Sequence, residues 1–197
     1  EIGCGTGHLL NEISKYYEAY GVEISNFALN EARRNCPGVK IYNISAEDLS
    51  CFQDDFFDGI LAKHVFEHLE RPETAFRECN RVLKERGMLI FVTPNLKCIS
   101  RHLKKSDWHG FRDPTHISLK QPEEWVRIIT DSGFRIEKTF SDGMWDVPYM
   151  PWVPKSIQKI IFGSLGGLQA VLGLSILPVF LGESLIILAR KLATEEF

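Results

Sequence analysis

The sequence has few cysteines, and none of them is spaced for a metal site. Five cysteines occur in 197 residues, and no two of them form a Cys-x-x-Cys pair. They are scattered along the chain at Cys4, Cys36, Cys51, Cys79 and Cys98. An odd, scattered set argues against a disulfide framework and a zinc site, so we predict no metal. It favours a reducing compartment, and we therefore predict a cytoplasmic protein.

The sequence also lacks an excess of basic residues. Lysine and arginine number 23 against 26 aspartates and glutamates, which gives a formal net charge of −3. Proteins that bind polyanions usually carry a basic excess, so we do not expect nucleic acid as a partner. A length of 197 residues, 44% of them hydrophobic, suits one domain with a full core, which we predict over residues 1–197.

Helical and strand patterns alternate along the chain. Apolar periodicity and capping residues predict helices over 8–18, 26–35 (with Ser25 as N-cap), 72–84 (closed by Gly87) and 122–132. Short apolar runs predict strands over 19–24, 39–44, 57–62, 88–93, 134–139 and 183–189. Strands that alternate with helices form a parallel sheet covered on both faces, so we predict the α/β fold class.

A glycine loop opens the chain, directly before a predicted helix, as Glu1-Ile2-Gly3-Cys4-Gly5-Thr6-Gly7. Glycines allow a tight turn and close approach of a ligand, and the helix N-terminus offers free N–H groups. Glu23 ends the next predicted strand, where a carboxylate can accept hydrogen bonds from both hydroxyls of a ribose. Because the loop begins as the last step of a strand, we expect a strand before Glu1 and an N-terminally incomplete domain. That strand should lie between the strands that end at Glu23 and Ala62.

Five segments in order resemble the motifs of class I S-adenosylmethionine-dependent methyltransferases. They are EIGCGTG (1–7), GVEIS (21–25), AEDL (46–49), FDGILAKHVFEHL (57–69) and GMLIFVTPN (87–95). The resemblance is to the broad ubiquinone-biosynthesis and small-molecule methyltransferase group, and it covers the chain to about Asn95. It implies a Rossmann-like, doubly wound sheet of seven strands, mostly parallel with an antiparallel last strand, whose first strand is truncated in this chain.

The resemblance also implies a site for S-adenosyl-L-methionine. The cofactor would contact eleven residues: Glu1, Gly3, Gly5, Gly7, Glu23, Ile24, Ser45, Ala46, Glu47, Ala62 and Lys63. The three glycines would lie against the methionine part and the ribose, and Glu23 would hold the ribose hydroxyls. Ile24 and residues 45–47 would border the adenine, and Ala62 and Lys63 the sulfonium. The family often has Asp where this chain has Ser45, whose hydroxyl is a weaker acceptor for the adenine amino group.

Residues 96–121 break the alternation and form a polar, aromatic insertion on the expected acceptor side of the sheet. It contains His116 and Asp113, three residues apart, in a loop that makes a better substrate wall than a solvated linker. We predict His116 as a general base and Asp113 as the group that fixes its tautomer. Alternatively, both side chains only hold the loop in place. Glu67 and His68 resemble a family element but also suit a helix start.

A second insertion, about 141–181, is apolar, and Ile160–Leu181 has no charged residue. The flanking strands should belong to one sheet, which argues against a simple membrane span. Three interpretations remain: an apolar cap over the domain, a pocket for a lipid-like acceptor, or peripheral membrane contact through 145–181.

The sequence therefore predicts methyl transfer to a small-molecule, sugar or lipid-linked acceptor, with oxygen as the accepting atom. The first alternative is a non-catalytic regulatory subunit that binds the same cofactor. A nicotinamide-dependent oxidoreductase is disfavoured, because its loop would follow the spacing Gly-x-Gly-x-x-Gly rather than Gly-x-Gly-x-Gly.

Overall fold

The computed structural model describes residues 1–193, so the last four residues of the predicted domain lie outside it. The strands are β1 (Tyr20–Val22), β2 (Lys40–Tyr42), β3 (Phe57–Lys63), β4 (Leu83–Pro94), β5 (Phe134–Ser141) and β6 (Ser184–Lys191). The helices are α1 (His8–Ser14), α2 (Asn26–Asn35), α3 (Pro72–Val82), α4 (Ile99–Lys104), α5 (His109–Arg112), α6 (Pro122–Asp131) and α7 (Lys155–Val171). Short 3-10 turns are η1 (Phe66–His68), η2 (Lys105–Asp107) and η3 (Val179–Leu181).

The strands follow the order β2-β1 and β3-β4-β6-β5, and Ile2 joins the two groups. Ile2 forms parallel bridges to Val22 of β1 and to Ala62 of β3, at the position predicted for the first strand. β6 runs antiparallel to both of its neighbours, β4 and β5, whereas β1–β2 and β3–β4 are parallel pairs. The predicted α/β, mostly parallel sheet with an antiparallel last strand is confirmed.

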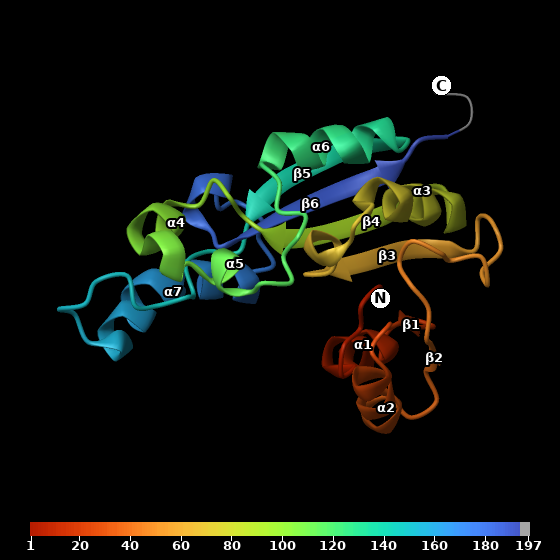
Figure 1. The fold of residues 1–197 in the computed structure, drawn as a ribbon, viewed down its shortest axis with the longest axis horizontal. Coiled ribbons are helices and arrows are strands. Elements are labelled where there is room, and N and C mark those ends of the chain that lie inside the picture. The colour runs from red at the N-terminus through yellow and green to blue at the C-terminus, as the bar shows by residue number, and fades with distance from the viewer. Residues whose placement is uncertain (194–197) are drawn as a thin grey trace.

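Two apolar clusters hold the helices on the sheet. α3 and α6 lie together over one face of the larger group of strands (Figure 1), where Phe76, Phe91 and Trp125 are fully buried and pack edge to face or tilted. α1 and α2 pack beside β1 and β2 through a smaller cluster that includes Leu10 and Ala32. Burial of a large apolar side chain contributes roughly 1.5–3 kcal/mol, so these contacts dominate the placement of the helices.

Two helices end earlier than the sequence predicts. α1 ends at Ser14 rather than residue 18, because Tyr16 and Tyr17 find no apolar partner and stay 80% and 72% exposed. α3 ends at Val82 and the chain enters β4 at once, because Leu83 already pairs with Phe57 of β3. Gly87 therefore lies within a strand instead of closing a helix.

The predicted N-cap of α2 is confirmed. Ser25 caps α2, with its side chain accepting a hydrogen bond from the Ala28 N–H. The insertion after Asn95 is less irregular than predicted, since it folds into α4, η2 and α5. The apolar insertion contains α7. Among the described residues, no helix is both long and apolar enough to cross a membrane.

Candidate functional site

The glycine loop turns from Ile2 into α1 with three left-handed glycines, whose φ angles are 65°, 53° and 83° at Gly3, Gly5 and Gly7. A Cβ on Gly3 would lie 2.2 Å from Val65 Cγ2, and one on Gly7 would lie 2.7 Å from Cys36 Sγ. A Cβ on Gly5 would meet nothing within 4 Å. Gly3 and Gly7 are therefore required by packing within the protein, whereas the Gly5 backbone borders open space that a ligand can enter.

Glu23 lies at the end of β1, beside this loop. Its carboxylate accepts a hydrogen bond from the Gly5 N–H at 2.9 Å and from the Ser25 N–H at 2.7 Å. The residue is only 8% exposed. Each carboxylate oxygen keeps a second lone pair, so Glu23 can still accept from the two hydroxyls of a ribose.

Glu1 contributes a second acid at the start of the loop. Burial raises the pKa of the Glu1 carboxyl to about 7, although Lys63 acts in the opposite direction. Its Oε2 atom is buried and has no hydrogen-bond partner among the described residues. An ammonium group would satisfy this oxygen and favour the ionised carboxylate.

The remaining predicted cofactor residues fall into exposed and buried groups. Ile24 is 71% exposed, as an apolar surface for a flat ring requires, and Lys63 is also exposed at the end of β3. Ala62 is fully buried and pairs with Ile2, so its side chain belongs to the core. Ala46 is also buried, at 6% exposure.

Ser45 and Glu47 already have partners within the protein. The Ser45 hydroxyl accepts from the Glu47 N–H at 3.1 Å. The Glu47 carboxylate accepts from the Arg71 backbone N–H at 2.8 Å and from its guanidinium at 3.1 Å, which fixes the start of α3. The structure therefore gives Glu47 a structural role, in addition to the adenine contact that the resemblance implies.

These groups fit the chemistry of S-adenosylmethionine. The cofactor presents an ammonium group, a ribose diol and an adenine, and the loop offers an orphaned buried carboxylate oxygen, spare acceptors on Glu23 and an exposed Ile24. Glu1, Gly5, Glu23 and Ile24 are the residues that would hold it.

A cluster of histidines lies on the other side of the candidate site, where β3 ends. η1 places Glu67 and His68 directly after β3, and the insertion returns His116 to them. The His68 and His116 rings lie 4.7 Å apart, centroid to centroid. The Ser118 N–H donates to the Glu67 carbonyl at 2.9 Å, which pins the insertion to η1.

The tautomer of His116 is set by a different group from the one predicted. His116 Nδ1 lies 2.7 Å from the Gly110 carbonyl oxygen, which can only accept, so Nδ1 is the protonated nitrogen. Asp113 Oδ2 lies 3.8 Å from Nε2, too far for a hydrogen bond. Hydrogen bonds from the Thr115 side chain and backbone N–H hold the pKa of Asp113 below its ordinary value. His116 Nε2 is left with a free lone pair, as a general base requires.

His68 is a member of this cluster that the sequence left undecided. The Thr115 hydroxyl donates to Asp113 at 2.6 Å, so His68 Nδ1, which is 2.9 Å from the same hydroxyl, acts as the donor. Asp113 therefore orients His68, through Thr115, and does not orient His116. The Glu-His-Leu element was the only sequence signal for this role, because Thr115 lies 47 residues away.

Glu67 is the buried centre of the cluster. Its carboxylate lies 3.1 Å from His64 Nδ1 and accepts from the Thr93 hydroxyl at 3.3 Å. One ligand atom each from Glu67, His68 and His116 lies within 4.8 Å of the others, so this set could hold a cation.

A second buried acid, Glu183, binds side chains from both insertions. It is fully buried and accepts from the Ser100 hydroxyl at 2.6 Å, the Trp108 indole at 2.9 Å and the Tyr149 hydroxyl at 2.5 Å. Burial alone would raise the pKa of Glu183, but the nearby His109 ring and the hydrogen bonds from these three groups outweigh burial and lower the pKa. His109 Nδ1 lies 3.4 Å from Glu183 and 3.7 Å from Asp146, so it belongs to this network.

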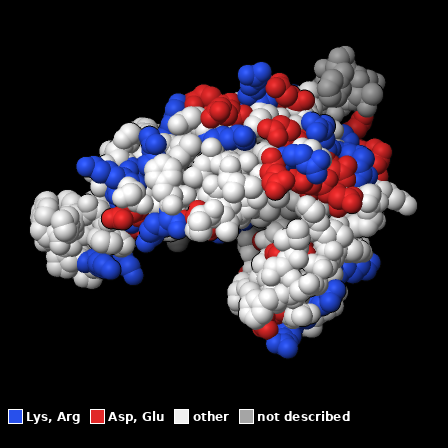
Figure 2. Space-filling model, in the orientation of Figure 1, with Lys and Arg blue, Asp and Glu red and all other residues white. Residues whose placement is uncertain are grey.

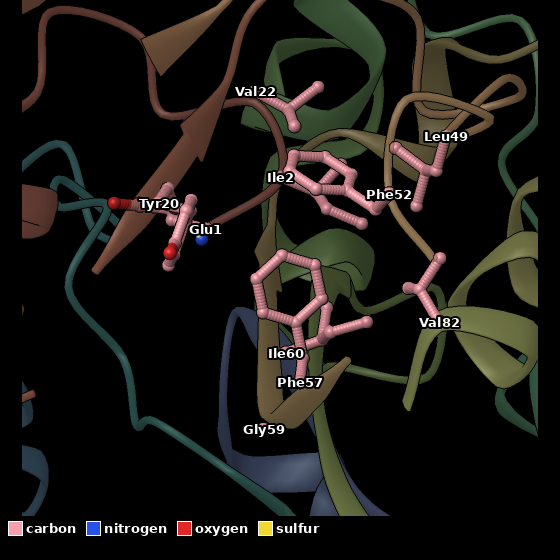
Figure 3. A pocket seen from close by; sticks show the side chains of 10 residues that line it. All are labelled: Glu1, Ile2, Tyr20, Val22, Leu49, Phe52, Phe57, Gly59, Ile60 and Val82. Carbon is pink, nitrogen blue, oxygen red and sulfur yellow. Dashed lines mark hydrogen bonds between the residues drawn. The ribbon is translucent and has the colours of Figure 1, made fainter. Parts of the chain in front are cut away.

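A recess between β1 and β3 is separate from the histidine cluster. Figure 3 shows apolar side chains from both strands facing it, and the larger set of lining residues is Glu1, Ile2, Tyr20, Val22, Leu49, Phe52, Phe57, Gly59, Ile60 and Val82. Glu1 is the only predicted site residue among them.

Comparison with known proteins agrees with this geometry. A family model described as a methyltransferase domain matches residues 1–91. The chain is 31% identical over 164 residues to a ubiquinone biosynthesis O-methyltransferase of Methylococcus capsulatus, covering 77% of this chain and 66% of that protein. It is 28% identical over 172 residues to the uncharacterized methyltransferase YcgJ of Bacillus subtilis, covering 79% of this chain and 63% of that protein.

Solved structures of methyltransferases have a similar fold. A crystal structure of an S-adenosylmethionine-dependent methyltransferase from Archaeoglobus fulgidus superposes with a TM-score of 0.67 at 23% identity, over 96% of this chain and 84% of that one. This similarity supports the strand order and the position of the glycine loop. Residues 1–91 thus match a methyltransferase domain in sequence, and the chain as a whole has the fold of an S-adenosylmethionine-dependent methyltransferase.

Proposed function

We propose that the protein transfers a methyl group from S-adenosylmethionine to an oxygen of a small-molecule acceptor. The observation that supports this most directly is the orientation of His116, whose Nδ1 is committed to the Gly110 carbonyl while Nε2 stays free to accept a proton. This nitrogen belongs to the cluster that follows β3. Ile2, which leads into the glycine loop, pairs with Ala62 near the same end of β3.

The bound cofactor supplies an electrophilic methyl group on a sulfonium. The protein aligns the acceptor with that methyl group, which lowers the barrier by fixing distance and direction. As the acceptor oxygen bonds to the methyl carbon, its proton passes to His116 Nε2. The His68 ring lies beside that of His116, and its unprotonated Nε2 would accept a hydrogen bond from a second polar group of the acceptor.

We propose further that the acceptor is lipid-linked or similarly apolar. One relative is named for ubiquinone biosynthesis and another as a demethylmenaquinone methyltransferase. The exposed apolar side chains of the insertion, such as Phe111 and Ile117, suit an acceptor of this kind better than a free sugar. Peripheral membrane contact through 145–181 would bring the protein to such an acceptor.

The test is transfer of a labelled methyl group to a lipid extract and to an aqueous extract, with the isolated protein. Label in the lipid extract that disappears in His116→Ala supports the proposal. Label only in the aqueous extract would replace a lipid-linked acceptor by a soluble one. Tight cofactor binding without transfer to either extract would favour the regulatory subunit.

A further inference from the structure

Helix α7 buries its two glutamines and exposes most of its aliphatic side chains. Gln158 is fully buried, and its side chain accepts from the Tyr149 N–H at 2.6 Å and donates to the Met150 carbonyl at 2.7 Å. Gln169, three turns later on the same face, donates to the Ser141 carbonyl at 2.8 Å and accepts from the Leu177 N–H at 2.7 Å. These bonds fix the orientation of the helix through its polar face.

The opposite face of α7 is aliphatic and open. Ile157, Ile160, Ile161, Leu168 and Val171 are spaced for one side of a helix, and they are between 46% and 85% exposed. The chain that follows adds Leu172, Leu174, Ile176 and Phe180, all at least 44% exposed. We call these nine side chains the α7 surface. A helix against water would have the reverse arrangement, so this face is built for a non-aqueous partner.

The α7 surface itself contains no acidic residue. Between Val147 and Gly182 the sequence contains no Asp or Glu, and its only charged residues are Lys155 and Lys159, both exposed and off the aliphatic stripe. α4 packs against η3, next to Phe180, and adds exposed His102, and η2 follows it with exposed Lys105 and Asp107. Figure 2 shows this end of the molecule as a largely uncharged lobe, with several basic groups and fewer acidic ones beside it. Because the only charges on α7 and its flanking segments are Lys155 and Lys159, the helix suits an anionic surface better than a cationic one.

The dimensions favour a helix that lies on a bilayer. α7 has 17 residues, whereas about 20 apolar residues are needed to span the hydrocarbon core. An in-plane helix has an apolar face toward the acyl chains and lysines on its polar face, which is the arrangement of α7. Trp152, 77% exposed, lies just before the helix, where an amphipathic ring suits the headgroup level.

We propose that the α7 surface docks the protein on an anionic lipid bilayer, with α7 parallel to the membrane. The aliphatic stripe enters the boundary between headgroups and acyl chains, and the lysines contact lipid phosphates. The surface contains none of the residues that the proposed methyl transfer uses, so docking and chemistry can be tested separately.

The test is sedimentation of the protein with vesicles of phosphatidylcholine alone or with added phosphatidylglycerol. The protein should bind the mixed vesicles, and Ile160→Asp and Val171→Asp should each weaken binding by at least roughly tenfold. The double variant Lys155→Gln/Lys159→Gln should lose roughly fivefold for each lysine, with a smaller salt dependence. Tyr16→Asp, an equally exposed position near α1, is the matched control and should bind as the wild type does.

Calorimetric titration with S-adenosylmethionine accompanies each variant. Unchanged cofactor affinity shows that a variant is folded and that a loss of vesicle binding belongs to the surface. Two results would overturn the proposal. One is wild-type binding by both Asp variants, and the other is a dimer, seen by light scattering without lipid, that Ile160→Asp dissociates.

Discussion

The two ends of the candidate site are built in different ways. The cofactor end is local: the three glycines, Glu23 and Ser25 lie within one motif pair, and Glu23 is held by backbone N–H groups from that pair. The acceptor end is assembled over long distances, with His68 meeting Thr115 across 47 residues and Glu183 meeting Ser100 across 83. The first end depends on backbone conformation, and the second depends on buried polar side chains.

The largest effect should come from the acceptor end, at Glu183. Glu183→Ala leaves Trp108 and Tyr149 with buried donors and no acceptor, and should destabilise the fold by about 3–5 kcal/mol. Thermal or denaturant unfolding measures this. The control Glu12→Gln removes an exposed pair with Lys15 and should change stability by less than about 0.5 kcal/mol. A tolerated Glu183→Ala would show that the insertion is held by its apolar contacts instead.

The same acid predicts a pH dependence of stability. The pKa of Glu183 is lowered in the folded protein, so its contribution is complete above the ordinary glutamate value of about 4.3 and is lost as pH falls through the lower, folded value. Stability measured on the acid side should therefore fall less steeply in Glu183→Gln than in the wild type. Parallel acid limbs would exclude this contribution.

The next effect concerns the rate of methyl transfer. His116→Ala removes the free Nε2 and should lower the single-turnover rate at least about 100-fold, with cofactor affinity nearly unchanged. Asp113→Asn should have a smaller effect, because Asp113 acts on His68 through Thr115. His102→Ala, in the exposed part of α4, is the control. A near wild-type rate in His116→Ala would exclude general-base catalysis by His116, and the protein would then act only by aligning the acceptor with the methyl group.

At the cofactor end, Glu23→Ala should weaken S-adenosylmethionine binding by about 1.5–3 kcal/mol, the usual cost of losing hydrogen bonds to a charged group. Calorimetric titration measures this, with Glu31→Ala on the exposed side of α2 as the control. Equal affinity of Glu23→Ala and wild type would remove Glu23 from the site.

The smallest effects separate two glycines of the loop. Both have a left-handed φ, so Ala at either position costs about 1–2 kcal/mol of strain. Gly7→Ala should destabilise further, because its Cβ meets Cys36 and Ala32, whereas Gly5→Ala adds no clash and should instead weaken cofactor binding. Unfolding and titration of the pair distinguish these outcomes, and the reverse pattern would place the ligand at Gly7.

The difference between the two ends also decides what the sequence could predict. The Ser25 cap and the glycine loop follow from short-range signals, whereas the antiparallel last strand was implied by the family resemblance; the structure confirms the cap and that strand. The tautomer of His116 was assigned to the wrong partner because sequence proximity favours Asp113, while the turn of α5 presents the Gly110 carbonyl. Glu183 gave no signal, since its partners come from three separate segments.

The outward face of α7 shows the same limit. The sequence predicts an apolar segment but not its orientation, because Gln158 and Gln169 look like surface residues on a helical wheel. Their hydrogen bonds to the backbone of 141–153 and 176–177 turn them inward and leave the isoleucines outside.

The separation of cofactor binding from acceptor chemistry is tested most directly by the double variant Glu23→Ala/His116→Ala. Its cofactor affinity is measured by calorimetry, and its single-turnover rate is measured at saturating cofactor. We expect the affinity of Glu23→Ala alone and the rate of His116→Ala alone, each within the roughly 0.5 kcal/mol that independent sites allow. An affinity or a rate lower than that of the corresponding single variant by about tenfold would contradict it, because the two ends would then act as one coupled unit.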